Sequence, residues 1–152
     1  MQQKTKRLGI VSYSEDEIIL FSQGLIGLPH LRRFILRTSR QTEPIRWLIS
    51  LDEAVELPII RPEPFFPNYR PKLPDLSAIL GSGELSLFCI LVLPRKLVKM
   101  TIDLRAPLLI NPKTREGMQY AGAELNHQPA AKHAYRELFG NFQTGTTEKK
   151  PC

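Results

Sequence analysis

The chain has 152 residues, of which 42% are hydrophobic and 24% charged, the composition of one globular domain with a substantial core. Its net charge of +6 indicates either a solubilising surface or one that attracts phosphate groups. The longest apolar run, Leu87 to Leu93, is far shorter than the roughly 20 residues of a membrane-spanning helix, and the N-terminus lacks an apolar signal-peptide core. We therefore expect a cytoplasmic protein without a membrane span.

The first third of the chain predicts four short strands, at residues 8–13, 18–21, 34–38 and 45–51. Met1–Lys6 is polar, and we expect it to be poorly anchored. In the fourth strand Trp47 and Ile49 share one face, while the other face carries Arg46, Leu48 and Ser50. This alternation is typical of a half-buried strand.

Two glycines and a proline separate the second and third predicted strands. Gly24 and Gly27 are interpreted as sites of close backbone packing or positive φ, because no lysine or further glycine follows at phosphate-loop spacing. Pro29 suits a first helical position, so Pro29 to Arg33 predicts one helical turn.

The segment from Leu57 to Pro74 is rich in proline, which excludes a helix and a central strand from most of it. We expect an ordered loop or an edge strand there. Its aromatic residues Phe65, Phe66 and Tyr69 would either pack into the core or be displayed to a partner. Pro74 to Leu80 then predicts a short helix that ends at Gly81.

The stretch from Leu87 to Leu93 is apolar on both faces and predicts a central strand. Apolar residues then alternate with polar ones, which predicts a second hairpin arm with Val98, Met100 and Ile102 in the core. Residues 106–110 predict a third strand, residues 111–117 a polar loop, and residues 118–121 a return to strand. The result would be an antiparallel meander.

The C-terminal region predicts a helix at residues 129–139, with Pro129 at its first position and Gly140 after its end. Ala131, Ala134, Tyr135 and Leu138 would share its apolar face. Residues 141–152 predict a disordered polar tail. The whole pattern favours an all-β, mainly antiparallel fold over residues 1–140: a small barrel or sandwich-like domain with one or two short helices.

The sequence contains no recognisable catalytic or metal-binding constellation. Cys89 is interpreted as a buried, reduced thiol, and the three histidines are too scattered for metal-ligand spacing. Asp52, Glu53 and Glu56 are interpreted as caps of a turn. We therefore expect a binding protein, not an enzyme, without metal or cofactor. The alternatives are a basic barrel that binds single-stranded RNA and a hydrolase using Asp52, Glu56 and His30.

Three blocks of sequence resemble the flagellar assembly factor FliW family. They are Ile19 to Leu28, then Trp47 to Asp52 leading to Pro64–Tyr69, and finally Thr101 to Asn111 followed by Thr114–Gln119. The resemblance runs from about Leu8 to Phe139. It departs from the family pattern at Asp103, where asparagine is usual, and at Asn68, where aspartate often precedes the tyrosine.

The resemblance implies a protein that exchanges two partners. FliW-like proteins bind newly made flagellin and, once flagellin is exported, bind the RNA-binding regulator CsrA and relieve its repression of flagellin translation. We expect the same here, for a monomer that binds no nucleic acid directly. The resemblance suggests Tyr135 as a contact for the regulator. Acidic residues 15–17 and 52–56 are candidate contacts for a basic regulator. The other candidate contacts are Phe65, Tyr69, Asn111, Arg115 and Gln119.

Overall fold

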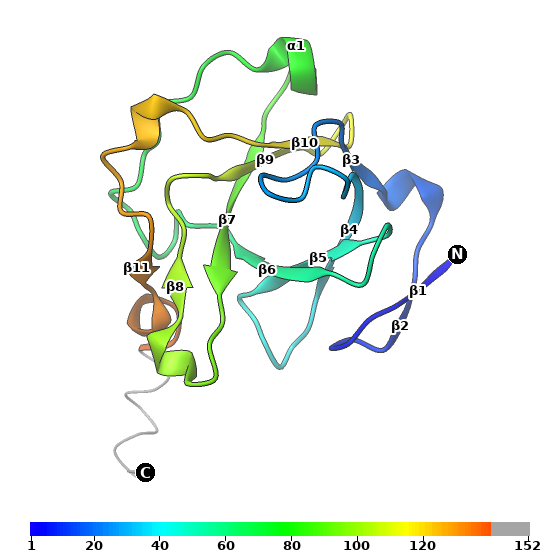
Figure 1. Cartoon of the computed structure of the whole chain (residues 1–152), viewed down its shortest axis with the longest axis horizontal. Coiled ribbons are helices and arrows are strands. Elements are labelled where there is room, and N and C mark those ends of the chain that lie inside the picture. Colours follow the sequence, from blue (N-terminus) through cyan, green and yellow to red (C-terminus); the bar gives the residue numbers. More distant parts are fainter. Residues whose placement is uncertain (141–152) are drawn as a thin grey trace.

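The computed structural model describes residues 1–140, which form a seven-stranded β-barrel seen end-on in Figure 1. β7 pairs with both β6 and β9, and this second pairing closes the barrel. Neighbouring strands are antiparallel except β3 and β10, which are parallel. The all-β prediction is confirmed, as a barrel. Its strands are β3 (Ile19–Phe21), β4 (Arg33–Thr38), β5 (Arg46–Ser50), β6 (Glu56–Ile60), β7 (Ser86–Val92), β9 (Leu108–Asn111) and β10 (Glu116–Gln119).

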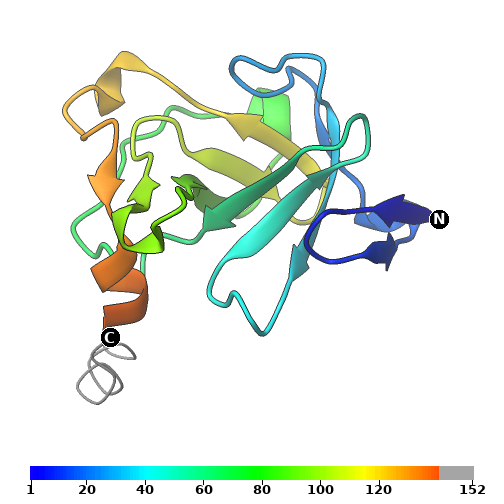
Figure 2. The same ribbon diagram turned by 60° about the horizontal axis from the view of Figure 1, so that its bottom comes forward.

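Shorter elements lie around the barrel. β1 (Gln2–Lys4) and β2 (Ile10–Ser12) form a hairpin on one side, and the C-terminal helix lies on the opposite side (Figure 2). β8 (Thr101–Ile102) pairs with β7 and with β11 (Lys132–His133). Within residues 1–140, no helix has the length and apolar character needed to cross a membrane. The helical elements are η1 (Glu15–Glu17), α1 (Ser77–Leu80), η2 (Leu97–Lys99), η3 (Ala123–Leu125) and a helix at residues 135–140.

The two larger apolar clusters are built on the same barrel strands. One fills the barrel, where the rings of Phe21 and Phe34 meet edge to face at 5.1 Å. The other covers the outer face of β4 to β7 and includes Trp47, Cys89 and Met100. Because β7 contributes to both clusters, the prediction of a strand covered on both faces is confirmed. Each large side chain so buried contributes about 1.5–3 kcal/mol to stability.

The predicted hairpin arm after β7 is partly wrong. Met100 and Ile102 are buried as expected, but Val98 is 61% exposed. The turn that begins at Pro94 continues into η2, so the chain resumes strand pairing only at Thr101. The next strand pair also differs, because β10 begins at Glu116 and not at Met118.

Because the barrel is closed, the predictions for two other strands are wrong. Leu48 and Ser50 of β5 are buried, so this strand is covered on both faces and not half-buried. β6 is a central strand although it contains Pro58. β7 pairs only with Ile59 and Ile60 of β6, so the missing N–H of Pro58 does not interrupt that ladder.

The predictions for two N-terminal segments are wrong. Met1–Lys6 is anchored, because β1 pairs with β2 and the N–H of Tyr13 donates to the carbonyl of Met1 at 2.9 Å. Residues 29–33 form no helical turn. Leu31 is instead fully buried in the barrel, and the chain enters β4 at Arg33.

The C-terminal helix is present but begins at residue 135, not 129. Residues 132–133 form β11 because they pair with β8, and the N–H of Ala134 donates to the carbonyl of Met100 at 3.2 Å. Ala134 and Leu138 are buried as predicted, whereas Ala131 is exposed. The predicted tail, residues 141–152, lies outside the described residues.

Gly24 and Gly27 both have positive φ, 69° and 84°, but only Gly24 is also crowded. A Cβ at Gly24 would overlap the backbone of Pro29, whereas one at Gly27 would meet nothing within 4 Å.

Gly27→Ala is expected to lower the free energy of unfolding by about 1–2 kcal/mol, because alanine is strained at positive φ. Gly24→Ala should lower it by more, because its Cβ also clashes with the backbone of Pro29. Urea unfolding of the two variants checks this, and equal losses would contradict it.

Candidate protein-binding surfaces

A first cavity, of about 270 Å³, lies between the proline-rich loop and the C-terminal segment. We call it the aromatic cavity. Phe65 is half-buried at its wall, whereas Phe66 and Tyr69 are buried. The Lys132 ammonium lies 5.3 Å from the Phe66 ring centroid, within cation–π range. Of the loop aromatics, Phe65 is therefore the one with surface to offer a partner.

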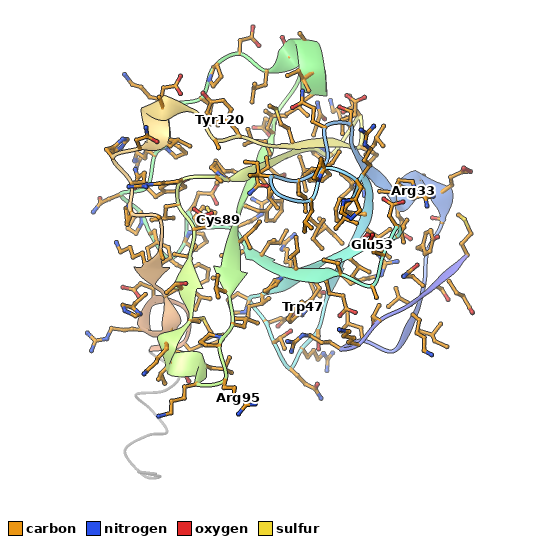
Figure 3. The ribbon with its side chains drawn as sticks, viewed as in Figure 1. Arg33, Trp47, Glu53, Cys89, Arg95 and Tyr120 are labelled. Atoms are coloured by element: carbon orange, nitrogen blue, oxygen red, sulfur yellow. The ribbon has the colours of Figure 1, made fainter. Side chains whose placement is uncertain are left out.

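Tyr69 anchors the proline-rich loop to the barrel. Its hydroxyl donates to the carbonyl of Leu104 at 2.8 Å. Burial raises the pKa of Tyr69, so the phenol keeps its proton and remains a donor. Cys89, labelled in Figure 3, lies in the same apolar cluster, and burial raises the pKa of its thiol to about 12. The protonated thiol is a poor nucleophile, in keeping with its interpretation as a core residue.

Asn111 is fully buried and bonded within the chain. Its Nδ2 donates to the carbonyls of Leu80, at 2.8 Å, and Ser82, at 3.1 Å. Its Oδ1 accepts from the N–H groups of Lys113, at 2.9 Å, and Thr114, at 3.2 Å. Asn111 thus joins the β9–β10 turn to the end of α1, and a partner cannot reach it in this conformation.

Arg115 and Gln119 also hold loops in place. The Arg115 guanidinium donates to the carbonyl of Glu17 at 2.7 Å. Gln119 Oε1 accepts from the N–H of Ile26 at 2.9 Å, and its Nε2 donates to Ala106 at 3.2 Å. Both side chains are half-buried, and neither lines the aromatic cavity. The structure therefore does not bring them together with Phe65.

A second and larger cavity, of about 510 Å³, opens beside the C-terminal helix. We call it the C-terminal cleft. An adjoining cavity of about 130 Å³ shares Gln41, Leu97 and Phe139 with it and reaches inward to Trp47 and Met100. Of the candidate contacts, only Tyr135 lines this cleft. The lining residues are Arg40, Gln41, Glu43, Pro44, Leu97, Tyr135, Leu138 and Phe139.

The C-terminal segment borders both cavities. Lys132 and Glu137 line the aromatic cavity, while Tyr135, Leu138 and Phe139 line the cleft. A two-residue ladder to β8 and the buried side chains of Ala134 and Leu138 attach this segment to the barrel. A partner that displaced the segment would therefore alter both cavities.

The acidic residues make separate structural contacts. Arg33 and Glu53 lie on one side of the barrel in Figure 3, where Asp52 pairs with Arg33 at 3.1 Å and Glu53 with His30 at 3.0 Å. Burial acts to raise the pKa of Asp52, but hydrogen bonds from Arg32 and Arg33 outweigh it and hold that pKa below its usual value.

These contacts give no support to the hydrolase alternative. Glu56 accepts from the N–H groups of Lys6 and Arg7, and His30 is paired with Glu53 at the surface. Neither residue lines the aromatic cavity or the cleft, and Asp52 does not either. In residues 1–140, no group of three His, Cys, Asp or Glu side chains could hold a metal ion.

Comparison with known proteins places this geometry in a family. Residues 2–133 match the family model described as FliW protein. The chain is 40% identical over 125 residues to the flagellar assembly factor FliW of Thermotoga maritima, covering 78% of this chain and 83% of the relative. It is 34% identical over 137 residues to that of Lachnospira eligens, covering 84% and 91%.

A solved structure agrees with these relatives. The crystal structure of a flagellar assembly factor FliW superposes with a TM-score of 0.76 and 28% identity, covering 91% of this chain and 97% of the other. The family model, which spans residues 2–133, takes in every barrel strand as well as β8 and β11. The chain therefore belongs to the FliW family of flagellar assembly factors.

Proposed function

We propose that this chain is a cytoplasmic, monomeric flagellar assembly factor that binds flagellin and, when flagellin is exported, binds the translational regulator CsrA. Release of flagellin mRNA from CsrA would then couple flagellin synthesis to assembly. The observation that carries the proposal is the similarity, over most of the chain, to proteins named flagellar assembly factor FliW. The chain acts by binding and needs neither catalysis nor a cofactor.

Two open, partly apolar cavities support a role in protein binding. Aromatic residues border both of them, and aromatic side chains dominate the energetics of protein interfaces. Their common wall, residues 132–139, supports exchange, because a partner that moves this wall changes the other cavity. We assign Phe65 to flagellin, with Arg115 and Gln119 as further contacts, and Tyr135 to the regulator.

Local charge bears on the second partner. A regulator that binds RNA presents a basic surface, which the net charge of +6 would repel. Of the acidic residues at 15–17, Glu17 pairs with Arg37 at 3.1 Å, while Glu15 and Asp16 form no ion pair within residues 1–140. These two carboxylates are the acidic contacts that we propose for CsrA.

The proposal predicts mutually exclusive binding. Titration calorimetry of the full chain with flagellin and CsrA from its own organism, at physiological salt and free of RNA, should show tight one-to-one binding of flagellin. CsrA should bind only when flagellin is absent. Phe65→Ala should weaken flagellin binding about tenfold or more. Binding to neither protein, with salt-sensitive retention of RNA, would replace this proposal by the RNA-binding alternative.

A further inference from the structure

We infer that the C-terminal cleft binds an amphipathic α-helix whose apolar side enters the cleft and whose flanking side chains are acidic. The inference goes beyond the proposed function, because it specifies the chemistry of the bound segment whichever protein carries it.

Apolar surface is the first observation. Four of the eight residues that line the cleft are apolar, and Leu97 among them is 50% exposed; the four are Pro44, Leu97, Leu138 and Phe139. Val98, the neighbour of Leu97 in η2, is 61% exposed. Large apolar side chains grouped at the surface beside a cleft mark a binding site when polar residues surround them. A helix that enters the cleft would remove this surface from water.

The surrounding charge selects the partner. Arg95, Lys96 and Lys99 lie within two residues of Leu97 and are exposed, as are Arg40 of the cleft wall and Arg136 of the helix. Figure 3 shows Arg95 extending from this end of the molecule. None of these five cations forms an ion pair within the part of the chain that the structure describes. Acidic side chains on the bound helix would pair with them and steer its approach, whereas basic side chains on that helix would be repelled, whatever the charge of the rest of the partner.

The cleft walls favour a helix over an extended strand. The lining residues come from the β4–β5 loop, from η2 and from the C-terminal helix, so no strand edge borders the cleft. β8, the nearest strand to η2 in sequence, is paired on both sides, by β7 and β11. A bound segment must therefore satisfy its own backbone hydrogen bonds and bind through side chains, as a helix does.

The test uses a synthetic helix, so its outcome is separate from that of the flagellin and CsrA titrations. The probe is a fluorescein-labelled peptide of about 18 residues, long enough to be partly helical, with leucine at heptad positions a, d and e and glutamate on the flanks. The control peptide carries lysine for glutamate. In fluorescence anisotropy with the full chain, the acidic peptide should bind at least about tenfold more tightly than the basic one, with affinity falling as salt rises.

Two aspartate variants localise the binding. Leu97→Asp should weaken binding of the acidic peptide about tenfold or more, because it places a carboxylate among the apolar contacts. Ile26→Asp is the matched control, since Ile26 is 59% exposed and lies outside the cleft. Both variants should keep the wild-type circular dichroism spectrum, because both positions are exposed. Lys99→Glu should reduce the preference for the acidic peptide.

Four results would overturn the inference. If both peptides bound equally, the charge of the cleft surroundings would not select the partner. If the acidic peptide bound Leu97→Asp as tightly as the wild type, its binding site would lie outside the cleft. Displacement of the acidic peptide by poly(U) RNA would assign the cations to nucleic acid. Self-association in sedimentation, lost in Leu97→Asp, would make a second copy of the chain the occupant.

Discussion

Met100→Asp is expected to unfold the domain. Met100 is 1% exposed and lies in the apolar cluster that covers β4 to β7, beside Trp47 and Leu91. An unpaired carboxylate there costs several kcal/mol, against a total stability of roughly 5–15 kcal/mol for a domain of this kind. Circular dichroism and a thermal melt check the result. A soluble variant with the wild-type spectrum and a cooperative melt would contradict the assignment of Met100 to the core.

Val98→Asp is the control that tests the corrected position of this segment. Val98 is two residues away and would share the buried face if the chain were a regular strand. It lies in η2 instead and is 61% exposed. The free energy of unfolding of Val98→Asp should stay within about 0.5 kcal/mol of the wild type. A loss as large as that of Met100→Asp would show that Val98 is buried and that this segment is a regular strand.

The contrast between these residues shows what periodicity can predict. Seven consecutive apolar residues, Leu87 to Leu93, can be buried only if both faces of the strand are covered. β7 is covered on both faces as far as Leu91, whereas Val92 is 59% exposed. The later alternation from Val98 to Leu104 is equally long, but charged residues, Lys99 and Asp103, lie within it. A single turn of 3-10 helix fits the first part of that pattern as well as a strand does. Local spacing could not decide between them.

The C-terminal helix shows the limit set by long-range pairing. Ala130 to Phe139 has good helical periodicity, but β11 forms where β8 offers backbone partners, and the helix starts only after it. Tertiary pairing overrides local propensity here. Nothing near Lys132 in the sequence could have indicated its pairing with Ile102.

The candidate contacts stay predictions, and the structure adds which of them border a cavity. Phe65 and Tyr135 each border a cavity, but the cleft itself is built from the β4–β5 loop, η2 and the C-terminal helix, which are far apart in sequence. One signal was available for it. Leu97 and Val98 lie between the cations Lys96 and Lys99, and burial of so charged a segment is unfavourable. This pattern could have indicated that the two apolar side chains are exposed, against the core position predicted for Val98.

Asn111 is the candidate contact whose location differs most from the sequence-based prediction. A polar residue at the start of a polar loop is normally exposed, and sequence alone gives no sign that its amide would satisfy backbone groups of a distant segment. The Gly81 turn brings the carbonyls of Leu80 and Ser82 to it, 29 to 31 residues away in the chain. Its role is therefore tied to the fold.

Asn111→Leu is expected to lower the free energy of unfolding by about 3 kcal/mol or more. Leucine has similar volume but cannot donate to the two carbonyls or accept from the N–H groups of Lys113 and Thr114. The variant loses four hydrogen bonds, and each contributes about 0.5–1.5 kcal/mol to stability. Urea unfolding measures the loss. Asn68→Leu is the control, because Asn68 is exposed and should change stability by less than about 0.5 kcal/mol.

The Asn111→Leu variant also separates a structural role of Asn111 from a contact role. If Asn111 acts through the fold, Asn111→Leu should weaken flagellin binding only as far as it unfolds the chain, so binding should recover on cooling or in a stabilising osmolyte. The binding defect and the unfolded fraction should then change together with temperature. Full stability combined with lost binding would instead show that the side chain leaves its buried position to contact the partner.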